Sequence, residues 1–443
     1  MELKKYKLEE IAEIIPGYAF KSSDFGHGKN IAIKIKDIVP PGIDIKNADT
    51  VDVHPGERYQ LQSGDYVMAM TGATIGKIGK IGNCEKRIFI NQRVCKFIAN
   101  NLCDKEYLYY VLNSDYFQKF VLNNIDSKLA QPNIGHPTLY KFENLYPTLL
   151  EQKRIASVLS NIDSKIELNR AINQNLEAMA KQLYDYWFVQ FDFPDENGRP
   201  YKSSGGEMVW NEKLKRKIPA SWENKNIEDI ADVYNGATPS TINEQNYGGD
   251  IVWITPKDLS DQNQKFVYQG ERNISQAGYN SCSTHLLPPN TILMSSRAPI
   301  GLLSIAKTEL CTNQGFKSFV PKAENISTYL YYYLNIHIKQ IEQLGTGTTF
   351  KEVSREDVLK FPILKPSDAI LDLLEKQVSA LNNKQFVIQK ENEFLTKQRD
   401  ELLPLLMNGQ VSVNSDLSVY NKRRGKVPSL ILNDVSDIQV FHR

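Results

Sequence analysis

The segment from Gly72 to Ile78 is the part of this sequence that comes nearest to a catalytic motif, because a Lys follows its second Gly. A phosphate loop of the Walker A type needs four residues between its glycines and a Ser or Thr after the Lys. This segment has three residues between Gly72 and Gly76, and Ile78 follows Lys77. A similar later segment that contains Gly301 has no Lys after that Gly. We therefore exclude an ATP site and expect Gly76 and Gly301 to be turn residues.

Metal and nucleophilic chemistry would need clusters that this sequence lacks. The six histidines are scattered, with no HExxH and no i, i+4 pair, and no GxSxG is present. The five cysteines are odd in number and form no CxxC, which argues against a disulfide scaffold and a structural zinc. There is no glycine-rich cofactor loop and no Asn/Asp-Pro-Pro-Tyr/Phe motif of the amino-methyltransferases. The sequence predicts no catalytic residues, no metal and no cofactor.

Composition limits the partners. The chain has 443 residues, with 53 Lys plus Arg against 52 Asp plus Glu, so its formal net charge is +1. No field covering the whole molecule would attract DNA or an anionic membrane, and any nucleic-acid contact must come from a local patch. The N-terminal segment is polar, and no run approaches the roughly 18 apolar residues that span a bilayer. We expect a cytoplasmic protein in a reducing compartment, without a membrane partner.

The residues that could carry function belong to a sequence that repeats itself after about 220 residues, far longer than the period of a solenoid. Each half mixes alternating apolar stretches with Gly- and Pro-bearing turns, which is typical of a mixed α/β domain. Each half then ends in a long helical pattern. The repeat therefore predicts a duplicated unit of one domain and one helix. The matched segments are Leu8–Gly17 with Ile227–Gly236, Lys36–Ile38 with Lys257–Leu259, Ala73–Gly76 with Ala298–Gly301, Asn91–Gln92 with Asn313–Gln314, and Tyr107–Tyr110 with Tyr329–Tyr332.

The helical patterns predict an antiparallel coiled coil. Residues 151–190 contain no Gly or Pro, and the second pattern runs from about residue 367 to 408, with Pro404 expected to kink or end it and Gly409 as a stop signal. A helix of about 40 residues is about 60 Å long and would overhang its own domain, so pairing is favoured over simple capping of that domain. Polar residues, Asn169 and Gln385, interrupt the apolar spacing. The predicted pairing residues are Ile155, Ile162, Asn169, Leu176 and Leu183 in the first helix and Leu374, Leu381, Ile388, Leu395 and Leu402 in the second.

These residues carry a resemblance to a known family. LEEIAEIIPGYAF, the INQR and TNQG blocks, LLEQKRIASVLSNIDSKIELNRAINQNLEAMAKQLYDYWF and the following FDFP, GRPYKSSGG and IPASW segments closely resemble the specificity subunit of type I restriction-modification systems. The resemblance runs from Leu8 to about Gln410. It implies no catalytic activity of the subunit's own, two domains that each read one half of a bipartite double-stranded DNA target, helices that dock two methyltransferase subunits, and motor-endonuclease subunits that join them.

The expected fold is α+β, with two mixed α/β target-recognition domains in a pseudo-twofold arrangement, separated by the antiparallel helix pair. The second helix departs from the pattern, because Pro366–Ile370 stands where the first copy has Glu151–Ile155. The resemblance therefore does not imply equal docking at both ends. The expected parts are domain 1 at 1–150, spacer helix 1 at 151–190, a connecting segment at 191–225, domain 2 at 226–365, spacer helix 2 at 366–410 and a tail at 411–443.

For DNA contact we expect cations and amides on turns beside the β-like segments, because Lys, Arg and backbone N–H groups bind phosphates while Arg, Lys, Asn and Gln read base edges. Arg297 stands out, since its turn suits presentation of a rigid guanidinium fork. Each Lys has the alternative of being a solvated surface charge. The predicted DNA-binding residues are Lys21, Lys77, Gln92 and Arg93 in the first domain and Lys257, Arg297, Gln314 and Lys351 in the second.

Predicted partner-binding residues lie at the ends of the first helix: Gln152, Arg154, Tyr184, Tyr186, Trp187 and Phe188. For the aromatic cluster, packing onto the second domain is an equal alternative, because cores and interfaces favour the same residues. The paired Tyr-Leu-Tyr-Tyr segments are expected in the cores. Two other functions stay open: a methyltransferase with an unrecognised site, which would bind S-adenosylmethionine alone, and a protein scaffold that reads no DNA.

Overall fold

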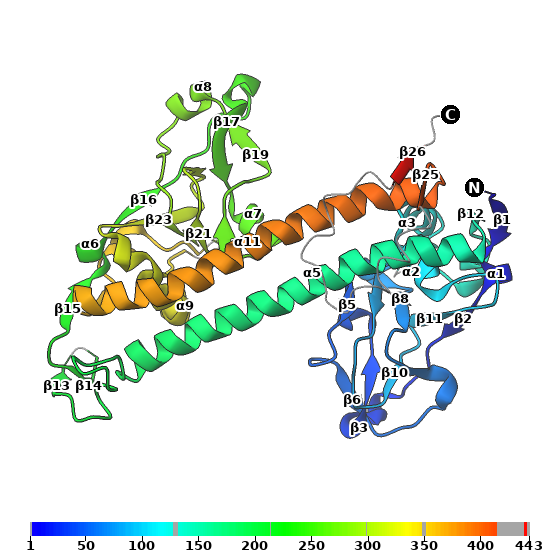
Figure 1. The fold of residues 1–443 in the computed structure, drawn as a ribbon, viewed down its shortest axis with the longest axis horizontal. Coiled ribbons are helices and arrows are strands. Elements are labelled where there is room, and N and C mark those ends of the chain that lie inside the picture. The colour runs from blue at the N-terminus through cyan, green and yellow to red at the C-terminus, as the bar shows by residue number, and fades with distance from the viewer. Residues whose placement is uncertain are drawn as a thin grey trace, which may run out of the picture. The chain divides into compact units, whose positions relative to one another are not determined.

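The computed structural model describes residues 2–126, 132–212, 214–297, 299–347, 351–413 and 438–440. The chain forms two compact units, the first made of Met1–Glu167 with Glu393–Arg443 and the second of Leu168–Asn392. The long helices α5 (Leu149–Tyr184) and α11 (Asp368–Met407) each contribute a stretch to both units (Figure 1). Each unit therefore combines a mixed α/β domain with part of both helices. The sequence predicts the domain in each unit, but it assigns one whole helix to each.

Unit 1 contains two main sheets. One has the antiparallel order β2-β11-β8-β9, and the other has the order β6-β3-β10-β7, in which β10 is parallel to β3. The Tyr-rich helix α2 buries Tyr107 and Tyr110 against the first sheet's core. The elements are β1 (Lys4–Lys7), α1 (Leu8–Ile11), β2 (Ala12–Pro16), β3 (Phe25–Ile33), β4 (Ile38–Val39), β5 (Gly42–Ile43), β6 (Asp49–Val51), β7 (Gln60–Leu61), β8 (Tyr66–Ala69), β9 (Ile78–Lys80), β10 (Ile88–Ile90), β11 (Val94–Ala99), α2 (Lys105–Asn113), α3 (Asp115–Asn123), α4 (His136–Leu139) and β12 (Glu143–Tyr146).

Unit 2 repeats this topology. Its main sheet has the order β16-β23-β20-β21-β18, and a smaller sheet, β19-β17-β22, keeps a parallel pair in β17 and β22. Helix α9 buries Tyr329 and Tyr332, as α2 buries its tyrosines. The elements are β13 (Met208–Asn211), β14 (Arg216–Pro219), β15 (Glu223–Asn226), α6 (Ile227–Ile230), β16 (Ala231–Asn235), β17 (Tyr247–Ile254), α7 (Pro256–Gln262), β18 (Phe266–Val267), β19 (Arg272–Ile274), α8 (Gln276–Asn280), β20 (Ile292–Ser295), β21 (Leu303–Ala306), β22 (Cys311–Thr312), β23 (Phe316–Pro321), α9 (Ser327–Gln343), α10 (Arg355–Leu359) and β24 (Pro362–Lys365).

The two helices are antiparallel. In unit 1, Arg399 donates from Nη1 to Asp163 Oδ1 at 3.1 Å. In unit 2, Asn169 donates to Glu391 at 2.8 Å and Asn173 donates to the Gln385 carbonyl at 3.2 Å. Residues further along α5 therefore bond to residues earlier in α11, which confirms the antiparallel prediction.

The residues predicted to pair the two helices are all at least partly withdrawn from solvent. Ile155, Leu176, Leu374, Ile388 and Leu395 are buried, together with the polar Asn169. The partly buried ones are Ile162, Leu183, Leu381 and Leu402. Burying apolar side chains every three to four residues is what stabilises a helix pair of this length, since isolated helices gain little from propensity.

The ends of both helices are set by local chemistry. Helix α5 continues as a π-helical turn over Asp185–Val189. Helix α11 continues three residues beyond Pro404, so this Pro lies in the last turn and does not end the helix. Gly409 follows with φ of 68°, and the Gln410 N–H donates to the Leu405 carbonyl at 3.0 Å, a C-terminal cap that favours Gly. Most of the tail after Gln410 lies outside the described residues; β25 (Val411–Val413) pairs with β26 (Ile438–Val440).

Candidate nucleic-acid interface

In unit 1, four loops at the ends of neighbouring strands meet, and we call them loop cluster 1: residues 17–18, 70–77, 91–93 and 132–134. Backbone hydrogen bonds join them, from Gln92 to Tyr18 at 2.8 Å, from Met70 to Arg93 at 2.9 Å and from Ile134 to Met70 at 3.0 Å. Loops 17–18, 91–93 and 70–77 flank β2, β11 and β8, which are successive strands of one sheet, so the sheet order brings these loops together.

Unit 2 builds the equivalent loop cluster 2 from residues 236–238, 296–297, 299–301, 313–315 and 351–353. Ala237 donates to Thr312 at 3.0 Å, Ser296 to Gly315 at 2.8 Å and Val353 to Ser296 at 3.1 Å. The Thr238 hydroxyl donates to the Gln314 side chain. The described part of both clusters thus has the same backbone frame.

A glycine is needed where the first loop of each cluster crosses the third. A Cβ on Gly17 would lie 2.1 Å from the Asn91 carbonyl oxygen, and a Cβ on Gly236 would lie 2.2 Å from the Asn313 carbonyl oxygen. Backbone atoms cannot yield by so much, so any larger residue would push the loops apart. The repeat in the sequence, which matches Gly17 with Gly236, records this close approach.

The predicted DNA-binding residues of the first domain lie on or beside loop cluster 1. Lys77, Gln92 and Arg93 belong to it and are exposed. Lys21 is exposed three residues beyond Tyr18, at the start of a 3₁₀ turn that is capped by Asp24, whose Oδ2 accepts the Lys21 N–H at 2.7 Å.

In unit 2, Arg297, Gln314 and Lys351 belong to loop cluster 2 and are exposed. Lys257 lies in the first turn of α7, next to Pro256, whose Cγ is 2.8 Å from the position of a Cβ on Gly315. The structure therefore brings the four residues predicted for this domain to one cluster and its border.

Carboxylates accompany these cations. Lys257 Nζ lies 2.9 Å from Glu271 Oε2, and the hydrogen bond with Glu271 raises the pKa of this exposed Lys. Arg297 Nε donates to Glu352 Oε2 at 3.0 Å. The Lys257–Glu271 pair is exposed and therefore screened by salt, so an incoming phosphate competes with Glu271 at little cost.

The sequence prediction omitted two cations beside loop cluster 1. Lys34 precedes a 3₁₀ turn (Ile35–Asp37) and Lys36 lies within it. Their Nζ atoms lie 2.9 and 3.4 Å, respectively, from Asp49 Oδ2. The Ile35 side chain lies 3.4 Å from the position of a Cβ on Gly72. The sequence repeat could have indicated Lys36, because it matches Lys36 with Lys257, which was predicted to bind DNA.

The Asp that follows Lys36 in unit 1 and the Asp that follows Lys257 in unit 2 both have a structural role. Asp37 accepts the Lys34 N–H at 2.8 Å, and Asp258 accepts the Thr255 N–H at 2.7 Å. Both are buried caps of a short helical turn. Burial is the largest influence on the carboxyl of Asp37 and raises its pKa. The duplicated Lys-Asp pair therefore combines an exposed cation with the cap that fixes its turn.

Most residues predicted to bind partners at the helix ends pack inside their own unit. Gln152 is buried, accepts the Asp104 N–H at 2.8 Å and donates to the Pro147 carbonyl at 3.0 Å. Arg154 is partly exposed and pairs with Glu151 at 3.0 Å.

Tyr184, Trp187 and Phe188 are buried in the unit 2 core, with the Tyr184 ring 5.4 Å from Tyr332. For these three and Gln152 the structure gives a packing role, and it leaves Arg154 and Tyr186 as the more exposed residues of the predicted surface. Sequence reasoning could not separate the two roles, because aromatics suit both.

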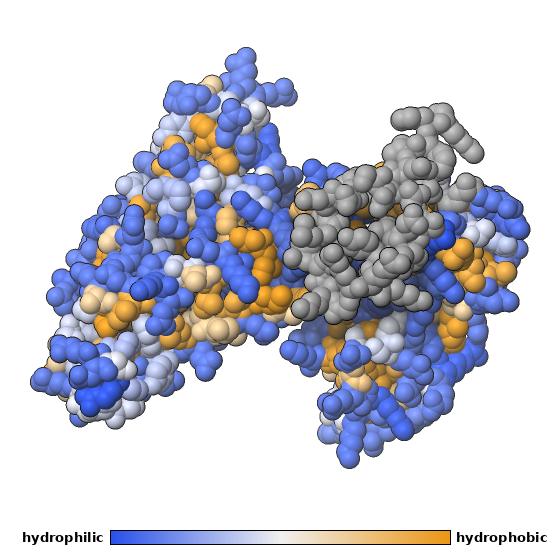
Figure 2. Space-filling model, viewed as in Figure 1, coloured by the Kyte–Doolittle hydropathy of each residue, from blue (hydrophilic) through white to orange (hydrophobic). Residues whose placement is uncertain are grey.

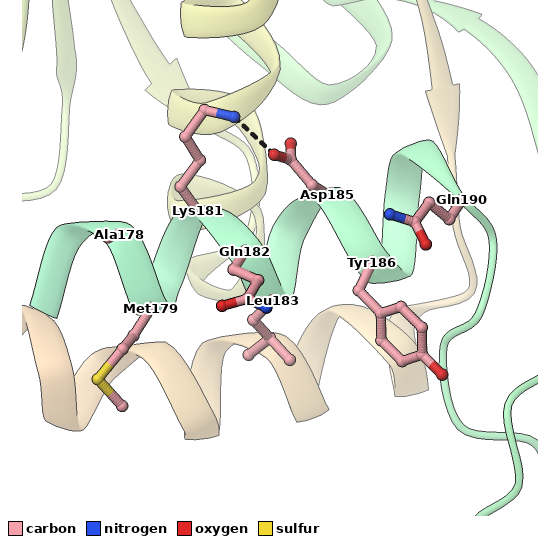
Figure 3. Close-up of a pocket in the computed structure, with 8 residues that line it drawn as sticks. All are labelled: Ala178, Met179, Lys181, Gln182, Leu183, Asp185, Tyr186 and Gln190. Carbon is pink, nitrogen blue, oxygen red and sulfur yellow. Dashed lines mark hydrogen bonds and ion pairs between the residues drawn. The ribbon is translucent and has the colours of Figure 1, made fainter. Parts of the chain in front are cut away.

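A groove runs beside the C-terminal part of α5 (Figure 3). It encloses about 720 Å³, and Met179, Leu183 and Tyr186 point to the same side of the helix, away from the Lys181–Asp185 ion pair. Met179 is 56% and Tyr186 37% exposed. The face of the molecule drawn in Figure 2 is mostly hydrophilic, with hydrophobic patches between the hydrophilic areas. Large apolar side chains that stay exposed in a row are a common mark of a protein interface. The lining residues are Ala178, Met179, Lys181, Gln182, Leu183, Asp185, Tyr186 and Gln190.

Comparison with known proteins decides the family. The sequence model of the type I restriction modification DNA specificity domain matches residues 1–178 and 219–393, which is most of the chain. The chain belongs to this family. The two matched regions correspond to the two copies of the repeat, so the family domain occurs twice.

Named relatives agree with this. The chain is 39% identical over 192 residues to the type I restriction enzyme MjaIX specificity subunit of Methanocaldococcus jannaschii, a match that covers 42% of this chain and 44% of the relative. It is 28% identical over 363 residues to the HindI specificity subunit of Haemophilus influenzae, which covers 70% of this chain and 78% of the relative. The first of these matches spans less than half of either protein.

A solved structure shares the fold. The S subunit of a type I restriction-modification system from M. genitalium superposes with a TM-score of 0.58 at 16% identity, over 92% of this chain and 96% of that one. Within the described ranges, this family member has no helix with the length and apolarity needed to cross a membrane.

Proposed function

We propose that this chain is the DNA-specificity subunit of a type I restriction-modification complex and has no catalytic role of its own. Each domain reads one half of a bipartite double-stranded DNA target, through loop cluster 1 and loop cluster 2. The observation that supports this is the duplicated cluster itself, which presents Arg, Lys and Gln side chains from a fixed backbone frame in both units. Such side chains read base edges and bind phosphates.

The two readers differ in chemistry, which suits two unlike half-sites. Loop cluster 1 presents Arg93 at the position where loop cluster 2 has Gly315. The two positions are equivalent because the Arg93 carbonyl accepts the Met70 N–H, as the Gly315 carbonyl accepts the Ser296 N–H. Loop cluster 2 instead presents Arg297. Guanidinium groups at different points of the same frame would address different bases.

We further propose that methyltransferase subunits dock on the helices and that motor-endonuclease subunits join this core. The groove beside α5, with its exposed Met179 and Tyr186, is a surface on which an apolar partner face would fit. Arg154 is a partly exposed cation near the other end of the same helix.

A domain exchange tests the two-reader proposal. Residues 1–150 are replaced by the same domain of another family member, and the chain is expressed with its methyltransferase. Methylation profiling of the host genome should show one half-site changed and the other kept, because each frame belongs to one unit. A change in both halves, or a single continuous target, would contradict the proposal.

The other functions predict different results. A protein scaffold would bind its partners yet give no sequence-dependent methylation with any methyltransferase. A methyltransferase with an unrecognised site would bind S-adenosylmethionine as an isolated chain, which calorimetry of the purified protein would detect.

A further inference from the structure

Arg297 is held in a fixed place by the backbone on both sides of its ion pair. It follows Ser296, whose N–H donates to Gly315 at 2.8 Å and whose carbonyl accepts from Val353 at 3.1 Å. Its partner Glu352 exchanges two backbone hydrogen bonds with Thr346, at 3.0 and 3.1 Å. Neither Arg297 nor Glu352 lies at a free loop tip. Their ion pair therefore joins two backbone segments that these hydrogen bonds already hold in position.

A buried Lys holds the carboxylate of Glu352 from the other side. Lys317 Nζ lies 3.2 Å from Glu352 Oε1, while Arg297 Nε lies 3.0 Å from Oε2, so the two cations use different oxygens. The side chain of Lys317 is 5% exposed, against 47% for Arg297. A charge buried to that degree needs a partner, and Glu352, with the Ser296 hydroxyl at 3.4 Å, provides one.

The carboxylate is charged under ordinary conditions. Partial burial raises the pKa of Glu352, and hydrogen bonds from Lys317 and Arg297 outweigh that effect, so the pKa lies below its usual value. Lys317 thus anchors Glu352 from within, and Glu352 in turn fixes one edge of the exposed guanidinium of Arg297. An anchored fork loses less rotamer entropy on contact with a ligand than a free one.

Unit 1 has the same backbone frame without these charges. Thr71 follows Met70 as Arg297 follows Ser296, and Asn133 precedes Ile134 as Glu352 precedes Val353, with the same hydrogen bonds. Cys95 pairs with Met68 as Lys317 pairs with Met294. The frame therefore does not need the ion pairs in order to fold, and the three charges are an addition specific to unit 2.

We propose that Glu352 is a positioning residue, which is held by buried Lys317 and orients Arg297 for readout of one base pair in the second half-site. This inference rests on the proposed function. It assigns the order of roles: Arg297 contacts DNA, Glu352 sets the plane and direction of its fork, and Lys317 keeps Glu352 in place.

The test uses the complex with the methyltransferase. Methylation rates are measured on the cognate duplex and on duplexes that each carry one changed base pair. Glu352→Gln should reduce discrimination at one pair of the second half-site by about tenfold, the range of a bidentate base contact, and should leave the first half-site unaffected. Arg297→Ala should remove the same discrimination, and adding Glu352→Gln to it should change nothing further.

Loss of folding is controlled separately, because Glu352→Gln leaves Lys317 buried without a carboxylate. The double variant Glu352→Gln/Lys317→Met has no buried unpaired charge, so it should restore thermal stability without restoring discrimination. Glu356, four residues after Glu352, is exposed and pairs with Arg355 at 3.3 Å. Glu356→Gln removes this carboxylate and should behave as wild type.

The inference would be overturned if Glu352→Gln kept its discrimination between base pairs. It would also be overturned if the affinity of Glu352→Gln for the duplex rose while its discrimination stayed the same, because Glu352 would then only compete with phosphate for Arg297. If the unaltered complex fails to discriminate at the second half-site, the proposed function itself fails. The two failures are therefore distinguishable.

Discussion

At the scale of single residues, buried polar groups tie the domains to the helices. Lys265 is the clearest case: its Nζ lies 2.7 Å from Glu177 on α5, 2.7 Å from the Tyr332 hydroxyl and 2.9 Å from Asn382 on α11. Desolvation by burial is the main influence and lowers the pKa of this Lys, although Glu177 opposes it. One cation thus fixes unit 2 to its stretch of both helices, a role that no local sequence pattern could indicate.

Buried tyrosines and cysteines predict alkaline unfolding. Burial raises the pKa of Tyr66, Tyr107 and Tyr110, and raises that of Cys95 and Cys103 to about 12. The unfolded chain loses these protons near pH 9 for Cys and pH 10 for Tyr, while the folded chain keeps them. These groups should therefore make the free energy of unfolding fall as the pH rises above about 9, as urea unfolding between pH 7 and 11 would measure. The lowered pKa values of Lys265, Lys307 and Lys96 act in the opposite direction, but the buried tyrosines and cysteines outnumber these three lysines.

Tyr107→Phe is a matched control for that prediction. The Tyr107 hydroxyl oxygen is buried and has no hydrogen-bond partner among the described residues. Removing it should leave stability at pH 7 nearly unchanged and make the fall above pH 10 less steep. An unchanged slope would show that this group does not contribute to the linkage.

At the scale of elements, the heptad spacing predicts both helices to within a few residues, because apolar burial along a seam is a local and periodic property. The sequence shows the polar residues that interrupt the heptads, but it does not show which residues they bond to. Asn169 donates to Glu391, and Gln385 donates to the Asn173 carbonyl at 3.2 Å and to Glu177. Buried polar pairs of this kind favour one register over others, and finding the partner needs the other helix. The loop clusters were missed as units for the same reason.

The exposed side of α5 carries a prediction about partners. Met179→Glu combined with Tyr186→Ala places a charge in the groove and removes the ring at its end. The methyltransferase subunit should then copurify at least tenfold less, because an unpaired charge opposes burial in an apolar interface. The measurement is pull-down from coexpressing cells, with circular dichroism to check the fold.

Ile242→Glu serves as the control, since Ile242 is 94% exposed in the same unit and lies outside the groove. It should retain the partner. Full retention by the groove variant as well would mean that docking uses another surface.

At the scale of the whole molecule, the sequence repeat predicts the duplicated topology, and the matched Gly17 and Gly236 mark the crossing of the loops. It could not predict which charges differ between the copies in space. Arg93 and Arg297 are 204 residues apart by their numbers and match no common motif, yet they occupy neighbouring points of equivalent frames. Strand pairing, which brings distant residues together, decides such equivalences.

Under the proposed function, the helix pair sets the spacer of a bipartite target, so the length of that spacer can be engineered. The helices are bonded directly to each other, as Asn169 is to Glu391, so a change in one alone would misalign the seam. One heptad added to both, after Glu167 in α5 and before Glu393 in α11, keeps the seam facing inward. Seven residues lengthen a helix by about 10 Å, the rise of about three base pairs. Methylation profiling should then show both half-sites unchanged and a spacer longer by about three base pairs. Seven residues added to α5 alone should reduce stability and methylation together. An unchanged spacer in the active double insertion would mean that the helices do not set the distance between the half-sites.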